Sequence, residues 1–307
     1  MLPEDAREAV RFVTKRGTSA IKSRRKKQIA KLKAAAEFLS PALERIRESG
    51  CPEHRDARAK IHGPLLRNIL QANGVRGYAW CGQFANAFPM IGALGEPGVY
   101  PAPEATRTPI SRGELFRHAA DTCKQAKRGS DPNATGPRGE ALAQVTKKWM
   151  TGPFSSNAQG DMWINGVAAR ANPAPRFGVR KADKIRAGDD LEKSFASEAT
   201  FISTPVNMPT WRHIAQMCLF FDLRGEIRTL AMAKAGHADA FRQLPLRTED
   251  VLTAAATLRN YQDGFFFGFA PGTQLFRAAA AVLHYGSFSR AVAALICRVL
   301  RIPCIGY

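Results

Sequence analysis

The sequence lacks several features that would place it in a familiar class of protein. Its cysteines are few and have no short paired spacing, standing at positions 51, 81, 123, 218, 297 and 304. Cys51 and His54 could form half of a zinc site, but no second half follows, so reduced thiols are expected. No G-x-x-x-x-G-K-[ST] loop for nucleotide phosphates occurs, and no nucleophile turn accompanies the scattered histidines.

Long uncharged apolar runs are also missing. The first ten residues, MLPEDAREAV, are charged and contain no apolar core of a signal peptide. The most apolar run, Ala278 to Leu300, is interrupted by His284, Arg290 and Arg298. This pattern predicts a core helix, with His284 as a hydrogen-bonded core histidine, rather than a membrane span. We therefore expect an intracellular protein that has no membrane partner.

Negative charge is scarce in this chain. Against 45 lysines and arginines stand only 26 acidic residues, so that 307 residues carry a net charge of +19. Such an excess favours a polyanionic partner, with nucleic acid as the first candidate and an anionic membrane as the second. The densest positive charge lies in a helix predicted over residues 4–49 and comprises Lys22, Arg24, Arg25, Lys26, Lys27, Lys31 and Lys33. The cluster indicates a nucleic-acid-binding patch or a nuclear localisation signal, and a merely solvated helix face is the alternative.

The distribution of helix and strand patterns predicts an α+β fold. Residues 1–127 are predicted as a basic helical region, and the Gly- and Pro-containing residues 128–139 as a flexible linker within a connecting segment, 128–159. The remainder, 160–307, mixes helices and strands without regular βαβ alternation. There we expect two short strands over 176–190, a helix over 207–225, a strand over 226–236, a hairpin over 253–271 and a long helix over 275–300.

Three segments of this second half resemble the palm motifs of a retroelement reverse transcriptase. They are AGHADAFRQLPL (235–246), TLRN with GFFFGFAPGTQLF and AAAVLHY (257–285), and LRIPCIGY (300–307). The resemblance implies an incomplete fingers–palm domain over residues 160–307 and the ancestry of an RNA-directed DNA polymerase. It also implies an RNA template and a DNA primer as partners.

The resemblance further implies a defect at the metal site. Such polymerases hold two Mg²⁺ ions between carboxylates, and one of these aspartates lies five residues before an aromatic residue. Counting back from Phe241 reaches Gly236, which occupies the metal-binding position. Asp239 and Ala240 match positions that cradle the incoming triphosphate, and Phe241 matches the aromatic residue that selects deoxynucleotides.

Other matched positions point the same way. Arg277 stands where the second motif has a glycine, and the chain stops at Tyr307, before the paired aspartates of the third motif. In the fingers, Arg186 with Asp190 and either Lys181 or Lys184 match nucleotide-contacting positions. The resemblance thus implies a truncated, catalytically degenerate copy that binds no Mg²⁺ and retains nucleic-acid binding.

Two alternatives stay open from the sequence. The first is an active polymerase whose missing carboxylates lie in a continuation of the gene or on a partner chain. The second is a non-catalytic basic protein that binds nucleic acid through its N-terminal helices.

Overall fold

The computed structural model of the chain has a mixed α+β fold, with 54% helix and 19% strand. This confirms the predicted fold class. The structure describes residues 2–16, 18–49, 61–75, 78–94, 108–128, 135–157, 160–164, 166–180, 182, 185–202, 209–222, 232–234, 236–237, 239–259, 266–275 and 278–305.

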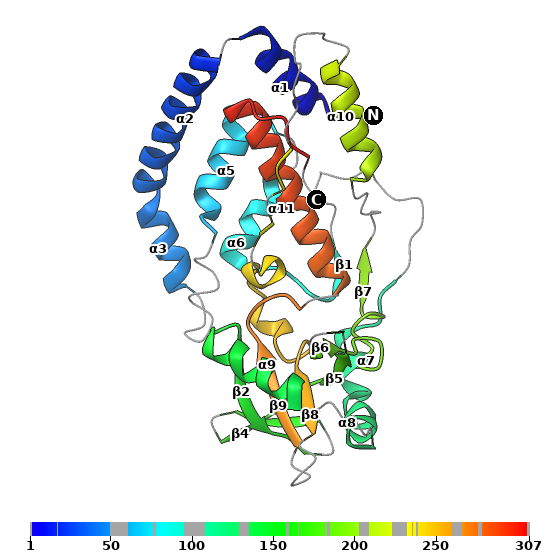
Figure 1. Cartoon of the computed structure of the whole chain (residues 1–307). Coiled ribbons are helices and arrows are strands. Elements are labelled where there is room, and N and C mark those ends of the chain that lie inside the picture. The colour runs from blue at the N-terminus through cyan, green and yellow to red at the C-terminus, as the bar shows by residue number, and fades with distance from the viewer. Residues whose placement is uncertain are drawn as a thin grey trace.

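A five-stranded sheet of order β2-β9-β8-β5-β6 forms one end of the molecule (Figure 1). Its strands are β2 (Met150–Ser155), β5 (Ala174–Arg180), β6 (Ile185–Asp189), β8 (Ala256–Arg259) and β9 (Phe266–Pro271). Neighbouring strands run antiparallel except β5 and β8, which are parallel. The pairings β5–β6 and β8–β9 confirm the two predicted hairpins.

Two smaller pairs of strands accompany the main sheet. Strands β1 (Gly92–Leu94) and β7 (Thr200–Ile202) are parallel, although more than 100 residues separate them. Strands β3 (Asp161–Ile164) and β4 (Val167–Arg170) form an antiparallel hairpin. Met162 of this hairpin is buried against Gly268 of β9, where a side chain larger than hydrogen would collide with its methyl group. The hairpin is therefore packed on the sheet.

Helix α9 (Thr135–Thr146) covers the edge of the sheet and begins within the predicted linker. The prediction of a flexible segment over residues 135–139 is wrong. Pro137 lies in the first helical turn, where backbone N–H groups have no acceptor within the helix, so proline costs no hydrogen bond there. Gly136 brings the helix against Ile185, and Glu140 accepts a hydrogen bond of 2.8 Å from the backbone N–H of Ala187. Glu140 thus satisfies a donor on edge strand β6.

Helix α11 (Ala279–Leu295) continues into a π-helical turn, Ile296–Leu300, and confirms the long helix predicted over 275–300. By length and composition Ala279–Leu300 could cross a membrane, but 61% of its most apolar window is buried inside the molecule. Such burial is typical of a core helix. Its partners include the aromatic residues Trp80, Phe84 and Phe88.

The predicted helix over 207–225 is confirmed as α10 (Trp211–Asp222). The strand predicted over 226–236 falls largely outside the described residues. Within its described part, Met232–Lys234 and Gly236, the chain forms no strand. The remaining short elements are η2 (Tyr78–Gly82), α6 (Gln83–Asn86), α7 (Arg112–Arg117), α8 (Ala119–Arg128), η3 (Ala240–Gln243) and η4 (Thr248–Asp250).

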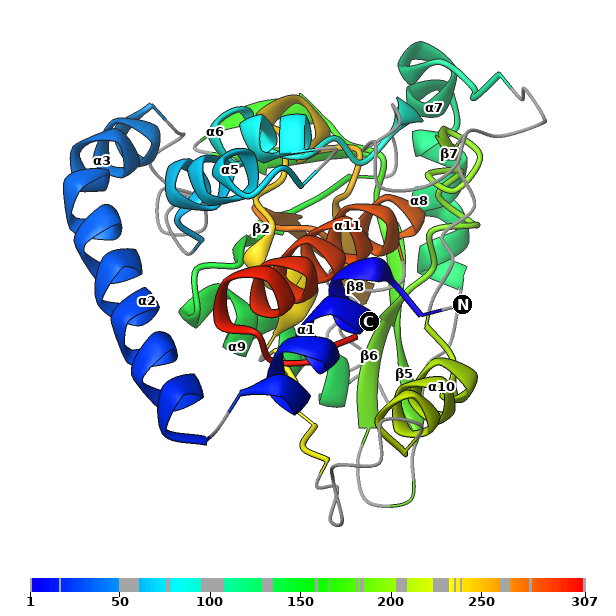
Figure 2. The same ribbon diagram turned by 90° about the horizontal axis from the view of Figure 1, so that it is seen from above.

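The N-terminal helices are α1 (Glu4–Lys15), α2 (Thr18–Phe38), α3 (Ser40–Glu48) and α5 (Gly63–Ala72). Of these helices, α1 and α2 contact the π-helical turn after α11, α5 contacts α11 itself, and α3 contacts α2 and α5. Arg298 pairs with Asp5 of α1, and Arg301 pairs with Glu8. Figures 1 and 2 both place α2 at the periphery of the molecule, with α11 near its centre.

The end of α9 generates a stability prediction. Trp149 N–H donates to Gln144 O and Lys148 N–H to Val145 O, both at 2.9 Å, which is a Schellman cap. Lys148 occupies its left-handed position with φ of 57°. Because glycine takes this conformation without steric cost, Lys148→Gly is expected to raise the free energy of unfolding by about 0.5–1 kcal/mol. Urea denaturation measures the change.

Lys147→Gly serves as the matched control for that variant. Lys147 lies one residue earlier, without positive φ, and its ammonium group is 4.3 Å from the centre of the Trp149 ring. Lys147→Gly is therefore not expected to raise the free energy of unfolding. If Lys148→Gly were no more stable than the wild type, the left-handed conformation at residue 148 would carry no steric cost.

Candidate nucleic-acid interface

Helix α2 exposes most of the basic cluster that the sequence predicts to bind nucleic acid. Its five lysines are all exposed: Lys22, Lys26, Lys27, Lys31 and Lys33. Among the described residues, none of them has a carboxylate within ion-pair distance. These five ammonium groups therefore present positive charge that the described part of the protein does not neutralise.

The two arginines of the cluster serve the fold instead. Arg25 donates from Nε to Leu300 O at 2.9 Å and from Nη2 to Arg301 O at 3.0 Å. The last carbonyl groups of a helix have no N–H donor within the helix, so Arg25, which donates to them, caps the C-terminal turn. The guanidinium of Arg24 lies 5.3 Å from the centre of the Phe12 ring. Both contacts fix α2 on the body of the protein.

The turn after residue 235 holds three of the residues predicted to contact a nucleotide. Asp239 is exposed and left-handed, with φ of 53° and ψ of 36°. Ala240 begins the 3₁₀ helix η3, and the Phe241 ring lies 5.3 Å from the Tyr285 ring in an edge-on arrangement. The exposed Gly236 has open space where a β-carbon would point, with no atom within 4 Å. The turn is thus an open surface feature.

The next residue of the turn points inward. Arg242 is buried and donates to Gln144 Oε1 of α9 at 2.8 Å. Gln144 donates in turn to Glu140 Oε1 at 3.2 Å. Burial, together with the neighbouring charge of Arg176, lowers the pKa of Arg242 to about 10. Arg242 therefore anchors the turn to α9 and the sheet.

A buried ion pair lies beside Arg242. Arg176 of β5 donates to both carboxylate oxygens of Asp189 on β6, at 2.7 and 3.0 Å. The two residues are directly opposite in the antiparallel pair. Burial opposes ionisation of Asp189, but the Arg176 guanidinium outweighs it and holds the pKa of the carboxyl below its ordinary value. Breaking one partner would leave an uncompensated buried charge.

The fingers residues are only partly brought together. Arg186 is exposed on β6. Asp190 accepts from the backbone N–H of Lys193 at 3.1 Å and pairs with its ammonium group, rather than with Arg186. The predicted positions Lys181, Lys184, Arg277 and Tyr307 lie outside the described residues.

The described residues do not fit the Mg²⁺ site that the family resemblance implies. No group of three or more histidine, cysteine, aspartate or glutamate side chains that could hold a metal occurs in the described part of the chain. Gly236 supplies no carboxylate, and Asp239 is an exposed acid on a left-handed turn. Hard Mg²⁺ requires oxygen ligands, so no catalytic step is assigned to a metal here. The described cysteines are free thiols.

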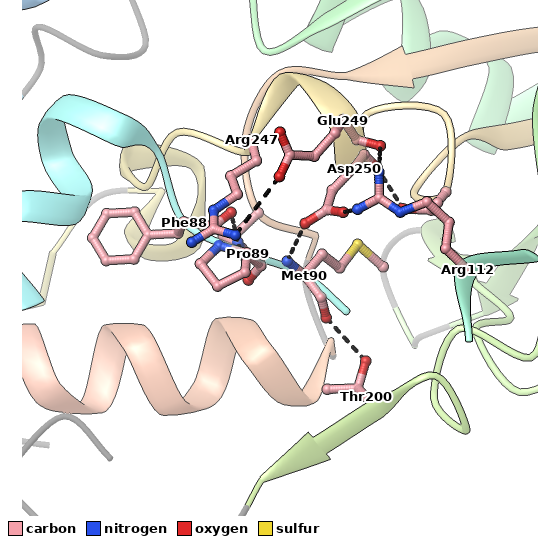
Figure 3. Close-up of polar contacts among 10 residues, drawn as sticks. Phe88, Pro89, Met90, Arg112, Thr200, Arg247, Glu249 and Asp250 are labelled. Carbon is pink, nitrogen blue, oxygen red and sulfur yellow. Dashed lines mark hydrogen bonds and ion pairs between the residues drawn. The ribbon is translucent and has the colours of Figure 1, made fainter. Parts of the chain in front are cut away.

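A buried backbone segment, residues 88–90, joins the turn to the rest of the protein (Figure 3). Phe88 N–H donates to Pro245 O at 2.8 Å, and Arg247 N–H donates to Phe88 O at 3.1 Å. The Met90 N–H donates to Asp250 Oδ2 at 2.8 Å. Pro245 and Arg247 lie between η3 and η4, and Asp250 ends η4. The three bonds therefore hold the turn against the buried segment.

Side chains from elsewhere in the chain satisfy the carbonyl groups of the same segment. Gln274 Nε2 donates to the carbonyls of Phe88 and Pro89, each at 3.2 Å. His284 Nε2 lies 3.1 Å from Pro89 O, and Thr200 Oγ1 donates to Met90 O at 2.9 Å. Figure 3 also shows Arg112 reaching Asp250 and the carbonyl of Glu249, the latter at 2.7 Å. The buried backbone groups of 88–90 are thereby satisfied.

Sequence reasoning missed the buried polar residues of this region. For Arg176 and Asp189 a signal existed, because opposite charges stand at equal distances from the predicted turn of the hairpin. For Arg242 and Gln274 no local signal exists, since Arg242 donates to Gln144, 98 residues away, and Gln274 donates to carbonyls 185 or more residues away. Comparison with known proteins adds no assignment: the chain matches no family model, no curated protein and no solved structure.

The buried histidine generates a prediction about pH. Burial, opposed by the hydrogen bond to the Pro89 carbonyl, lowers the pKa of His284 from 6.5 to about 4. The unfolded chain therefore takes up a proton at a pH at which the folded protein does not. The resulting stability is present above pH 6.5 and lost as the pH falls towards 4, with a total on the order of 3 kcal/mol.

His284→Gln tests this effect while keeping a donor towards Pro89 O. Urea denaturation at pH 7 and pH 4.5 is expected to give a smaller loss of stability in the variant than in the wild type. An identical pH dependence in the two proteins would show that His284 does not carry the linkage. The comparison of slopes is needed because the substitution also changes packing.

Proposed function

We propose that this chain is a non-catalytic nucleic-acid-binding protein of reverse-transcriptase ancestry, which binds phosphates through the exposed lysines of α2. The observation that carries the proposal is the set of five exposed lysines on one peripheral helix, with no ion-pair partner among the described residues. Lysine is a compact point charge suited to phosphate. Its neutralisation of phosphates releases counterions, which drives binding without reading sequence.

The ancestry in this proposal rests on the motifs quoted above and on their convergence in space. Phe241, from the first motif, contacts Tyr285, from the helix of the second motif. Residues 88–90 tie both motifs together through Pro245 and His284. Segments that are far apart in the sequence thus pack together, and this packing supports the proposed ancestry.

The proposal excludes catalysis because the described residues lack the carboxylates that would bind the metal ions. Two-metal phosphoryl transfer needs carboxylates that hold both ions at the reacting oxygens. At residue 236 a glycine faces open space, and the described residues offer no carboxylate cluster nearby. The neighbouring buried carboxylate, Asp189, is already committed to Arg176. The remaining activity is therefore binding.

Salt-titrated binding tests the electrostatic interface. Fluorescence anisotropy with labelled nucleic acid is expected to show a linear fall of log affinity with log salt concentration. The triple variant Lys26→Gln, Lys27→Gln, Lys31→Gln should reduce the magnitude of that slope by about 2–3, since each phosphate contact contributes roughly 0.9. Circular dichroism checks that the variants remain folded.

A charge-matched control separates α2 from general basicity. Lys124→Gln, Lys147→Gln, Lys193→Gln removes three exposed lysines elsewhere, so both triple variants change the net charge from +19 to +16 (19 − 3). The control is expected to change the slope by less than one. Equal effects of the two triple variants, or no binding at low salt, would overturn the proposed interface.

Primer extension tests the absence of catalysis. We expect no extension of a DNA primer on an RNA template with either Mg²⁺ or Mn²⁺, beside an active reverse transcriptase as a positive control. Gly236→Asp should fold like the wild type, because a β-carbon at residue 236 meets no atom within 4 Å. It should also remain inactive, because one carboxylate does not hold two metal ions. Extension above the blank by either protein would contradict this part of the proposal.

A further inference from the structure

The lysines of α2 form two stripes rather than one patch. Successive residues of an α-helix are rotated by about 100°. Lys22, Lys26 and Lys33 therefore lie within about 40° of one another, and Lys27 and Lys31 lie about 40° apart on a second line. The centres of the two lines are separated by about 140° around the helix axis. All five side chains are exposed, so both stripes reach solvent.

Small residues occupy the surface between the two stripes. Ser23, Ala30 and Ala34 project midway between them and are exposed, and Glu37, close to the end of the helix, projects between them nearer the first stripe. A partner can therefore approach the helix backbone closely while lysines extend past it on both sides. The opposite face carries Ile21, which is buried, and Arg25, which caps the end of α11. The helix is thus held with its lysine-flanked face outward.

The dimensions of this face match the groove of a DNA duplex. The five lysines span residues 22–33, so at 1.5 Å per residue they occupy about 17 Å of the 21-residue helix. Its diameter with side chains is about 10–12 Å, while the major groove of B-form DNA is about 12 Å wide. The major groove of A-form RNA is too narrow and deep to admit it.

The residue types on the face argue against two other modes of binding. Single strands are held by aromatic side chains on which bases stack, but the one aromatic residue of α2 is Phe38, at its last position. Bidentate reading of base edges in the groove needs arginine, lysine, asparagine or glutamine, whereas the surface between the stripes carries Ser19, Ser23, Ala30 and Ala34, with Glu37 one turn beyond Lys33. Contacts to both phosphate backbones remain, and these carry no sequence information.

We infer that α2 lies in the major groove of double-stranded DNA, with Lys22, Lys26 and Lys33 on one phosphate backbone and Lys27 and Lys31 on the other. This inference rests on the proposed function and specifies the class of nucleic acid. It requires both stripes at once, which a single-strand groove or a flat electrostatic patch does not.

The test compares a 25-base-pair DNA duplex with its isolated strand and with an RNA duplex of the same sequence, by anisotropy at several salt concentrations. Duplex DNA is expected to bind at least tenfold more tightly than either. Lys22→Gln, Lys26→Gln and Lys27→Gln, Lys31→Gln should each lower the duplex salt slope by about 2, and their effects should add. Equal weakening by the two stripes is the signature of contact with both backbones.

A variant of the small residues tests the close approach without changing charge. Ala30→Gln, Ala34→Gln should weaken duplex binding several-fold and leave single-strand binding unchanged. Ala143→Gln, on the exposed side of α9, is the control and should change neither. Thermal melting verifies the fold of each variant.

The outcomes separate the inference from the function on which it rests. Lysine-dependent binding that is as tight for the single strand as for the duplex, or tightest for RNA duplex, overturns the duplex-DNA inference and leaves nucleic-acid binding intact. Dependence on one stripe alone also overturns it. Absence of salt-dependent binding to all three ligands overturns the proposed function itself.

Discussion

The arrangement of this protein depends on the burial of one short backbone segment, residues 88–90. A buried peptide group without a hydrogen-bond partner costs about 1–3 kcal/mol, so the carbonyls and N–H groups of this segment constrain everything that reaches them. Their partners come from residues 200, 245, 247, 250, 274 and 284. One extended segment thereby positions β7, the turn before η4, the end of β9 and helix α11 relative to one another.

The same segment also fixes the orientation of the candidate interface through a series of contacts. His284 connects residues 88–90 to α11, and α11 runs through the molecule to the π-helical turn that ends at Leu300. Arg25 closes this chain of contacts by binding the carbonyls of Leu300 and Arg301. The basic helix α2 is therefore fixed with one face outward, and this orientation exposes both lysine stripes, whose spacing follows from the helix geometry.

Periodicity in the sequence was sufficient to predict the elements that local forces determine. Helix α11 combines a long apolar pattern with a proline at residue 303, and the two hairpins combine β-forming residues with polar turns. Helix α9 could not be predicted in this way. Its first turn contains Gly136 and Pro137, which favour a loop locally, and the contact with Ile185 decides the conformation instead. Tertiary packing overrides propensity at this point.

The candidate site was predictable in part for a similar reason. Exposure of a lysine-rich helix follows from its composition, whereas the diversion of Arg24 and Arg25 to structural contacts depends on Phe12 and on the end of α11. At the turn, the resemblance predicts roles for Asp239 and Phe241, but the sequence gave no indication that the adjacent Arg242 is a buried anchor.

The distribution of charge is consistent with the proposal that this protein binds nucleic acid without metal chemistry. A polymerase site gathers carboxylates whose mutual repulsion is relieved by bound cations. Around the present turn, the buried charges neutralise one another: Asp189 is held by Arg176, and Arg242 lies beside Glu140 and Gln144. Among the described residues of the turn itself, Asp239 alone is acidic, and one carboxylate does not hold two Mg²⁺ ions. Five exposed lysines without an ion-pair partner among the described residues lie on α2 at the periphery (Figure 1), and under the proposed function they attract phosphates to a helix surface rather than to the turn that resembles a catalytic motif.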